Sequence, residues 1–181
     1  MEVIIVYRKV YHSPLGKILL QSDGIYLTGL WFAGSRDESK HGSKYIEKDL
    51  PIFEETFRWL DLYFSGKDPD FTPAYKIENL TPFRQQVIDI MNQIPYGKVV
   101  TYQDIANKIA KLNKIPKMSA QAVGGAVGWN PICLIIPCHR VVGSNGSLTG
   151  YGGGIQNKVK LLELEKHDMS KFTIPKKGTA L

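Results

Sequence analysis

The chain has 181 residues, of which 43% are hydrophobic and 22% are charged, and its formal net charge is +6. This composition excludes a disordered or fibrous chain and fits one globular domain or two small ones. The first apolar run, residues 3–6, is too short for a signal-peptide core, and no segment is long enough to span a membrane. We therefore expect a cytoplasmic protein with no membrane partner.

Charge is distributed unevenly along the chain. Residues 1–96 contain 11 Lys and Arg against 13 Asp and Glu, a net charge of −2, whereas residues 97–181 contain 12 against 4, a net charge of +8. The basic half could meet nucleic-acid phosphates, although lysines that serve only solubility give the same count. The two cysteines, Cys133 and Cys138, are too few for a secreted disulfide scaffold, so at least one thiol is expected to be reduced.

The first half reads as a small α+β domain over residues 1–77. Three runs rich in β-branched and aromatic residues predict antiparallel strands joined by tight turns, at residues 3–10, 16–21 and 25–32. Residues 34–44 are polar and predict a loop. Residues 50–64 predict a helix, because Phe53, Phe57, Leu60 and Phe64 recur at helical spacing. Two prolines in residues 67–79 indicate a linker.

The second half reads as a helical domain over residues 78–168, followed by a flexible tail at 169–181. Thr81, Thr101 and Ser119 are suited to cap three successive helices, and residues 157–166 predict a last one. The first of these helices carries an apolar stripe of Val87, Ile90, Met91 and Ile94. Two short helices joined by a turn within a basic region suggest a helix-turn-helix, a fold that binds DNA.

The helix that follows Ser119 is unusually rich in small residues, including Gly124, Gly125 and Gly128. Each glycine inside a helix costs about 1 kcal/mol relative to alanine, so helix propensity does not account for them. The glycines are explained if another element approaches the helix closely, and that element is either part of the protein or a nucleic acid. The basic surroundings favour a nucleic acid.

The segment ICLIIPCHRVVG, residues 132–143, places Cys138, His139 and Arg140 after an apolar run. A cysteine in an apolar stretch is most often core filler, and Cys133 fits that description. Cys138 has polar neighbours, and an imidazole can take a thiol proton to produce the nucleophilic thiolate. Adjacent residues of a strand point in opposite directions, so contact between Cys138 and His139 requires a turn that begins near Pro137.

Two other kinds of site use the same residue types. Structural zinc is disfavoured because two cysteines and four histidines (His12, His41, His139 and His167) show none of the usual paired spacings, so we expect no metal site. A Cys/His hydrolase of acyl substrates remains an alternative. It explains neither the glycine-rich helix nor the uneven charge.

The chain resembles the O6-alkylguanine-DNA alkyltransferases, also called methylated-DNA–protein-cysteine methyltransferases. IPCHRVV at residues 136–142 is similar to their active-site signature, with Asn130-Pro131 before it and GYGGG at 150–154 after it. The likeness also covers TPFRQQVIDIMNQIPYGKVVTYQDIA and AVGGAVGWNP, and extends more loosely over residues 10–167. It implies an N-terminal α+β, ribonuclease H-like domain, and a C-terminal winged helix-turn-helix domain that carries the active site.

The resemblance implies that the protein is a DNA repair enzyme that needs no cofactor. Cys138 would accept an alkyl group from O6 of guanine, and possible further substrates include O4-alkylthymine. His139 would act as the base through an ordered water, and Glu165 would orient its imidazole. Tyr102 would donate a proton toward the guanine ring. Because a thioether has no easy route back to a thiol, each molecule would act once, as a monomer on double-stranded DNA.

The resemblance also implies a set of DNA- and base-binding residues. The target base is stacked inside the duplex, so it must be flipped into a pocket, and minor-groove entry suits the small residues of the glycine-rich helix. Gln121 stands where the family usually has an arginine, and glutamine lacks that charge and stacking plane. This departure keeps open a module that recognises lesions without repairing them, although such proteins lack the cysteine. The set comprises Gln103, Ala120, Gln121, Asn130, Arg140, Ser144, Tyr151 and Gly152.

Overall fold

The computed structural model describes residues 3–176, and the chain divides into two compact units. The first unit contains Met1–Glu78 together with Pro131–Ile135, and the second contains Asn79–Asn130 together with Ile136–Leu181. A short piece of the second half of the sequence therefore belongs to the first unit. Among the described helices, none combines the length and the apolar character needed to cross a membrane.

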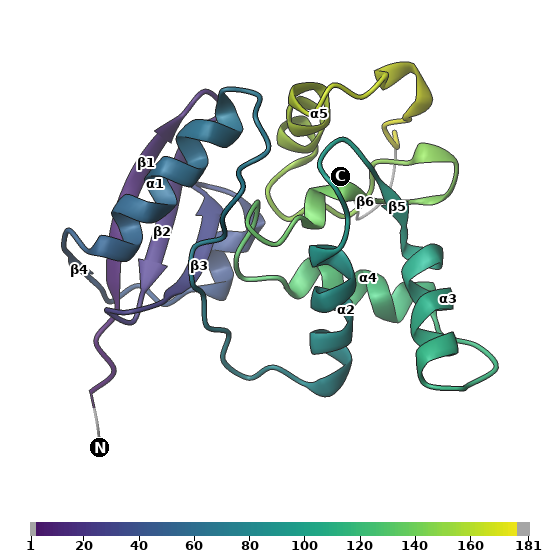
Figure 1. The fold of residues 1–181 in the computed structure, drawn as a ribbon, viewed down its shortest axis with the longest axis horizontal. Helices are drawn as coiled ribbons and strands as arrows, with labels where there is room; N and C mark the ends of the chain where they lie inside the picture. Colours follow the sequence, from purple (N-terminus) through teal and green to yellow (C-terminus); the bar gives the residue numbers. More distant parts are fainter. Residues whose placement is uncertain (1–2, 177–181) are drawn as a thin grey trace. The chain divides into compact units, whose positions relative to one another are not determined.

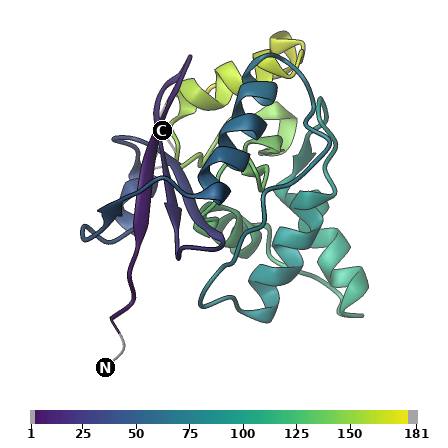
Figure 2. The ribbon, with the colours of Figure 1, turned by 60° about the vertical axis from the view of Figure 1, so that its left-hand side comes forward.

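The first unit is built on a four-stranded sheet in the order β3-β2-β1-β4. Strands β1 (Tyr7–Ser13), β2 (Gly16–Ser22) and β3 (Leu27–Phe32) form the antiparallel meander that the sequence predicts, and β4 (Ile46–Glu47) adds a short parallel partner to β1. Helix α1 (Pro51–Phe64) packs beside this sheet (Figures 1 and 2). Its Phe57 ring meets the Tyr11 ring of β1 at 5.0 Å between centroids, edge to face.

Three details of this unit differ from the sequence-based expectations. The first strand begins at Tyr7 rather than at residue 3, because Tyr7 is its first paired residue, opposite Ser22 of β2 and Ile46 of β4. The expected loop at 34–44 contains a 3-10 helix, Arg36–Lys40. The expected linker is partly tied to the sheet, since Leu27 accepts from Lys76 N–H and donates to the Ala74 carbonyl, each at 3.0 Å.

Residues Pro131–Ile135 extend the first unit at the outer side of β3. Leu30 of β3 donates to the Pro131 carbonyl at 3.0 Å, and its own carbonyl accepts from Cys133 N–H at 3.0 Å. Leu30 and Ile132 therefore form an isolated parallel bridge. The chain leaves this bridge and continues directly into the segment that carries Cys138.

The second unit contains α2 (Pro82–Asn92), α3 (Tyr102–Leu112), α4 (Ala120–Trp129) and α5 (Ile155–Leu164) (Figure 1). Side chains of Thr81, Thr101 and Ser119 cap the first three helices, which confirms the predicted starts. Strands β5 (Val100–Thr101) and β6 (Val141–Val142) pair in parallel. Helix α5 begins two residues earlier than the expected residue 157 and ends at Leu164.

The segment expected to be a flexible tail is ordered over the part that the structure describes. It starts with the 3-10 helix Met169–Lys171, and Thr173 then exchanges backbone hydrogen bonds with Gly146 and Leu148. Met169 and Phe172 pack on the buried cluster of Val142, Leu148 and Leu162, and this apolar contact explains the order. Residues 177–181 lie outside the described part of the chain.

Candidate active site

Cys138 opens a single 3-10 turn, Cys138–Arg140, that directly precedes β6. Pro137 before it has φ −81° and ψ 64°, and the Cys138 N–H donates to the Ile136 carbonyl at 2.8 Å. Consecutive side chains of a turn do not alternate as those of a strand do, so the geometric objection to a Cys138–His139 pair is removed. Cys138 is 7% exposed and His139 is fully buried.

The His139 imidazole and the Glu165 carboxylate form a buried pair. Nε2 of His139 lies 2.5 Å from Oε2 of Glu165, and neither side chain has any exposed area. When Nε2–H is donated to the carboxylate, Nδ1 is the basic nitrogen of the neutral ring. Burial lowers the pKa of His139 below its usual range, although Glu165 opposes this effect. The imidazole is therefore neutral at pH 7 and can accept a proton.

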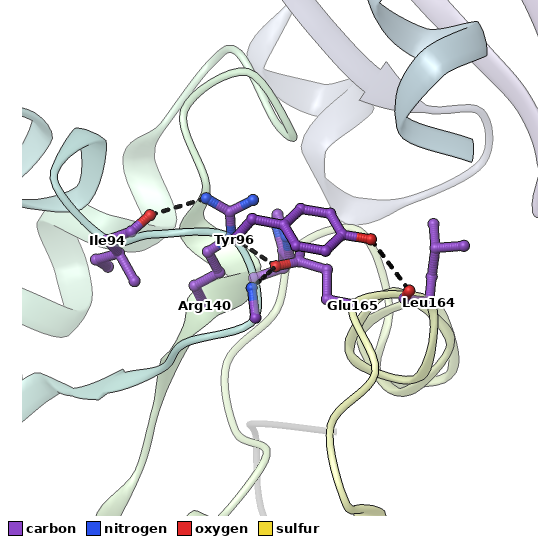
Figure 3. A network of polar contacts seen from close by, with 7 residues as sticks. Ile94, Tyr96, Arg140, Leu164 and Glu165 are labelled. Atoms are coloured by element: carbon purple, nitrogen blue, oxygen red, sulfur yellow. Dashed lines mark hydrogen bonds and ion pairs between the residues drawn. The ribbon is translucent and has the colours of Figure 1, made fainter. Parts of the chain in front are cut away.

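Two further donors hold Glu165 (Figure 3). The Gly97 N–H and Nε of Arg140 both donate to Oε1 of Glu165, at 3.0 and 2.8 Å. Burial alone raises the pKa of Glu165. The hydrogen bonds from His139 and Gly97 and the charge of Arg140 outweigh burial and lower this pKa to about 2. Glu165 is thus ionised at neutral pH.

Arg140, expected from the sequence to be among the DNA-binding residues, belongs to this buried network in the structure. The residue is 8% exposed, and its Nη1 donates to the Ile94 carbonyl at 2.8 Å. Its Cζ lies 5.7 Å from the centre of the Tyr96 ring, and the Tyr96 hydroxyl donates to the Leu164 carbonyl at 3.2 Å (Figure 3). A buried guanidinium needs such partners, and through them Arg140 holds the Glu165 carboxylate in place.

The carbonyl oxygen of Thr149 lies within reach of two donors, from the half-buried Tyr102 and the buried Lys158. The Tyr102 hydroxyl donates to it at 3.1 Å, and Nζ of Lys158 lies 3.4 Å away while donating to the Val141 carbonyl at 2.6 Å. Burial first, and the charge of Cys138 second, raise the pKa of Tyr102 to about 12. Burial lowers the pKa of Lys158 to about 8 against the opposing effect of Cys138. Tyr102 therefore keeps its proton at neutral pH.

The sequence-based expectations did not include Lys158, which is fully buried on α5. A signal for it does exist in the sequence. The buried residues of α5 are Ile155, Lys158, Leu161 and Leu162, which recur at helical spacing and place the lysine on the apolar face. A lysine at a core position needs a specific partner, and here that partner is backbone carbonyl oxygen together with the nearby thiol.

The other expected residues lie in several places of the second unit. Asn130 is buried and its Nδ2 donates to the Ile136 carbonyl at 3.0 Å, which ties the end of α4 to the segment that leads to Cys138. Tyr151 is 4% exposed, with its ring centre 5.8 Å from Nζ of Lys158, and the adjacent Gly152 is half-buried. The remaining residues are exposed or half-buried: Gln103, Ala120, Gln121 and Ser144.

Two family descriptions match the chain. Residues 82–167 match "6-O-methylguanine DNA methyltransferase, DNA binding domain", and residues 6–75 match "6-O-methylguanine DNA methyltransferase, ribonuclease-like domain". A methylated-DNA–protein-cysteine methyltransferase of Haemophilus influenzae is 38% identical over 162 residues, which cover 89% of this chain and 87% of the relative. One of Methanosarcina acetivorans is 38% identical, over 88% of this chain and 98% of the relative.

Solved structures agree with these sequence relatives. Mycobacterium tuberculosis OGT in complex with DNA aligns with a TM-score of 0.75 and 36% identity, covering 92% of this chain and 94% of that one. The O6-methylguanine-DNA methyltransferase of Pyrococcus kodakaraensis aligns with a TM-score of 0.62 and 25% identity, covering 89% and 99%. With Cys138, His139 and Glu165 on a helix-turn-helix unit, the chain belongs to the methylated-DNA–protein-cysteine methyltransferase family.

Proposed function

We propose that the protein repairs DNA by moving an alkyl group from O6 of guanine to Sγ of Cys138, once per molecule. The observation that carries this proposal is the buried chain of contacts from the Cys138 turn through His139 to Glu165 and Arg140. In the reaction the bond from O6 to the alkyl carbon breaks and a bond from sulfur to that carbon forms. The leaving group is the guanine anion, which must take up a proton.

His139 and Glu165 serve to produce the thiolate. Because Nε2–H of His139 is donated to Glu165, Nδ1 can take the thiol proton, directly or through one water. The imidazolium so formed is stabilised by the ionised carboxylate. The ammonium of Lys158 lies close enough to Cys138 to favour the negative sulfur. The thiolate is the form that attacks carbon.

Tyr102 serves the leaving group. Its hydroxyl carries a proton at neutral pH and donates a hydrogen bond to the Thr149 carbonyl. When a flipped guanine enters, we infer that this hydroxyl turns toward the ring and supplies the proton as negative charge develops there. Tyr151 and Gly152 close the pocket over the base, in the loop between positive-φ residues Gly150 and Gly154.

Helix α4 is the element that we propose enters the minor groove. A Cβ at Gly125 or Gly128 would meet no heavy atom within 4 Å, and one at Gly124 would lie 3.8 Å from Tyr102. Packing among the described residues therefore requires none of the three glycines. A groove wall that approaches the helix closely accounts for them, and this supports a DNA partner over a protein element. Gln121, exposed on this helix, would face the gap left by the flipped base.

The experiment that tests the proposal uses duplex DNA with a methyl-labelled O6-methylguanine. We expect one label per protein molecule, located on Cys138 by peptide mass spectrometry, and none on the Cys138→Ala variant. Label on Cys138→Ala would refute the assignment. Tight binding to damaged DNA with no change in protein mass would instead indicate a lesion-recognition module, and repeated turnover of acyl esters would indicate a hydrolase.

We further propose that the protein acts as a monomer in the cytoplasm, where thiols stay reduced. Residues 97–181 carry a net charge of +8, so we expect binding to duplex DNA to weaken as salt increases, through release of counterions. A sedimentation measurement at several protein concentrations, followed by a salt titration of DNA affinity, tests both statements. A salt-independent affinity would count against phosphate contacts.

A further inference from the structure

The segment that follows α5 is paired with the loop that precedes α5, and both belong to the second unit. The Thr173 N–H donates to the Gly146 carbonyl at 3.0 Å, and the Leu148 N–H donates to the Thr173 carbonyl at 2.8 Å. Thr173 and Ser147 therefore form an isolated parallel bridge. We call residues 168–176 the strap, because they lie along this loop as a strand lies along its neighbour.

Apolar packing adds to these hydrogen bonds. The half-buried Phe172 of the strap packs, with Met169, on the buried cluster of Val142, Leu148 and Leu162. Leu148 has no exposed area. Because burial of apolar surface is favourable, the strap and the loop stabilise one another through Phe172 and Leu148.

Gly146 marks the point where the strap passes closest to the loop. Its φ is +72°, and a Cβ built on it would lie 2.2 Å from the Lys171 carbonyl oxygen and 3.2 Å from Cα of Phe172. Both neighbours are backbone atoms and cannot rotate away as a side chain can. Any side chain at Gly146 therefore displaces the strap, which makes this glycine a second handle on the same contact.

The held part of the loop lies directly beside the group that places Tyr102. Thr149 follows Leu148, and its carbonyl accepts the Tyr102 hydroxyl at 3.1 Å. The next residue, Gly150, is also close, since a Cβ there would lie 3.6 Å from the Tyr102 hydroxyl oxygen. One residue therefore separates the backbone that the strap fixes from the acceptor of the proposed proton donor.

We propose that Phe172 is a positioning residue for Tyr102. By holding the strap on the loop, Phe172 fixes the Thr149 carbonyl, and that carbonyl keeps the Tyr102 hydroxyl in place before a base enters. The inference rests on the proposed function, and it needs no contact between Phe172 and the substrate. A general acid must lie within hydrogen-bond reach of the atom that it protonates, so a displacement of about 1 Å is costly.

The test measures single-turnover methyl transfer from O6-methylguanine duplex with the full chain. Rate constant and amplitude are separated, because amplitude reports the folded fraction and the rate constant reports the geometry of the site. We expect Phe172→Ala to lower the rate constant about tenfold, with the amplitude unchanged. Phe172→Leu keeps an apolar side chain on Leu148 and is expected to stay within about twofold of the wild type.

A pair of glycine variants tests the strap without removing an apolar side chain. Gly146→Ala displaces the strap and is expected to slow transfer about tenfold, as Phe172→Ala does. Gly34→Ala is the matched control: Gly34 has a similar φ of +75°, but a Cβ there would meet no heavy atom within 4 Å. Its backbone strain is therefore alike, and its rate should equal that of the wild type. If Phe172→Ala does not fold, this pair carries the test.

A double-mutant cycle separates positioning of Tyr102 from general loosening of the unit. If the strap acts through the Tyr102 hydroxyl, its loss has no further effect once that hydroxyl is gone. We therefore expect Tyr102→Phe/Phe172→Ala to react within about twofold of Tyr102→Phe alone. A merely structural role of Phe172 would slow the reaction with or without the hydroxyl, so the two losses would multiply.

Two results would overturn the inference: rate constants of Phe172→Ala and Gly146→Ala that match the wild type, or losses that multiply in the double variant. The wild-type protein is assayed first. Absence of methyl transfer there would refute the proposed function and this inference together, whereas normal wild-type transfer with either of the two results would refute the inference alone.

Discussion

Nε2 of His139 and Oε2 of Glu165 are 2.5 Å apart, and both side chains are completely shielded from solvent. The two residues are 26 positions apart in the sequence, one in a 3-10 turn and the other at the end of α5. Arg140, next to His139 in that turn, donates to the other oxygen of the same carboxylate. A single anion therefore orients both the proposed base and the residue that follows it.

Glu165→Gln is expected to slow alkyl transfer by about 10- to 100-fold, the usual cost of removing a group that orients a reactive residue. A neutral amide neither fixes the imidazole tautomer as firmly nor stabilises the imidazolium. Single-turnover transfer to duplex substrate measures the effect. Glu163→Gln, an exposed position on the same helix, is the matched control and should react like the wild type. Equal rates for the two variants would remove Glu165 from the mechanism.

Glu165 also makes stability depend on acid pH. Its folded-state pKa of about 2 lies below the ordinary value of 4.5, so the unfolded chain binds more protons between these limits. The ionised carboxylate therefore adds about 3 kcal/mol to the free energy of unfolding above pH 4.5, and this contribution is lost as pH falls toward 2. Denaturant unfolding at pH 7, 4.5 and 3 should show a steeper loss for the wild type than for Glu165→Gln. Parallel curves would contradict the paired, ionised state.

Tyr102→Phe is expected to slow transfer about 100-fold, since a positioned general acid commonly contributes at least that much. DNA affinity should change little, because the ring remains and only the hydroxyl that meets Thr149 is removed. Rapid-quench transfer and equilibrium binding separate the two effects. Tyr26→Phe, at a 41% exposed tyrosine of the first unit, serves as control. An undiminished rate would rule out the proton-donor role.

Gly125→Ala should affect stability and DNA affinity in opposite directions. Nothing within 4 Å would meet the new Cβ, so the free energy of unfolding is expected to rise by about 1 kcal/mol from helix propensity. Affinity for duplex DNA should fall, because the methyl group occupies space that the proposed groove contact needs. Thermal unfolding and a binding titration test both effects. A more stable variant with unchanged affinity would show that this face of α4 does not meet DNA.

The sequence by itself determined most of the local structure. Thr81, Thr101 and Ser119 start the helices of the second unit, because a side-chain oxygen before an apolar stripe satisfies free N–H groups of the first turn. The meander of β1 to β3 follows in the same way from runs of β-branched residues separated by turn residues. The motif around Cys138 identified the family, because its residues are contiguous.

Only the tertiary structure decided which distant groups meet. Arg140, expected at the DNA surface, is buried against Glu165, and Lys158, not expected at all, lies near the thiol. The order of the strap likewise has no local signal, because Thr173 finds its partners Gly146 and Leu148 in a loop much earlier in the chain. Capping and periodicity act within a few residues and can be read along the chain. Burial and charge pairing depend on groups far apart in sequence, and their outcome is settled only when the chain has folded.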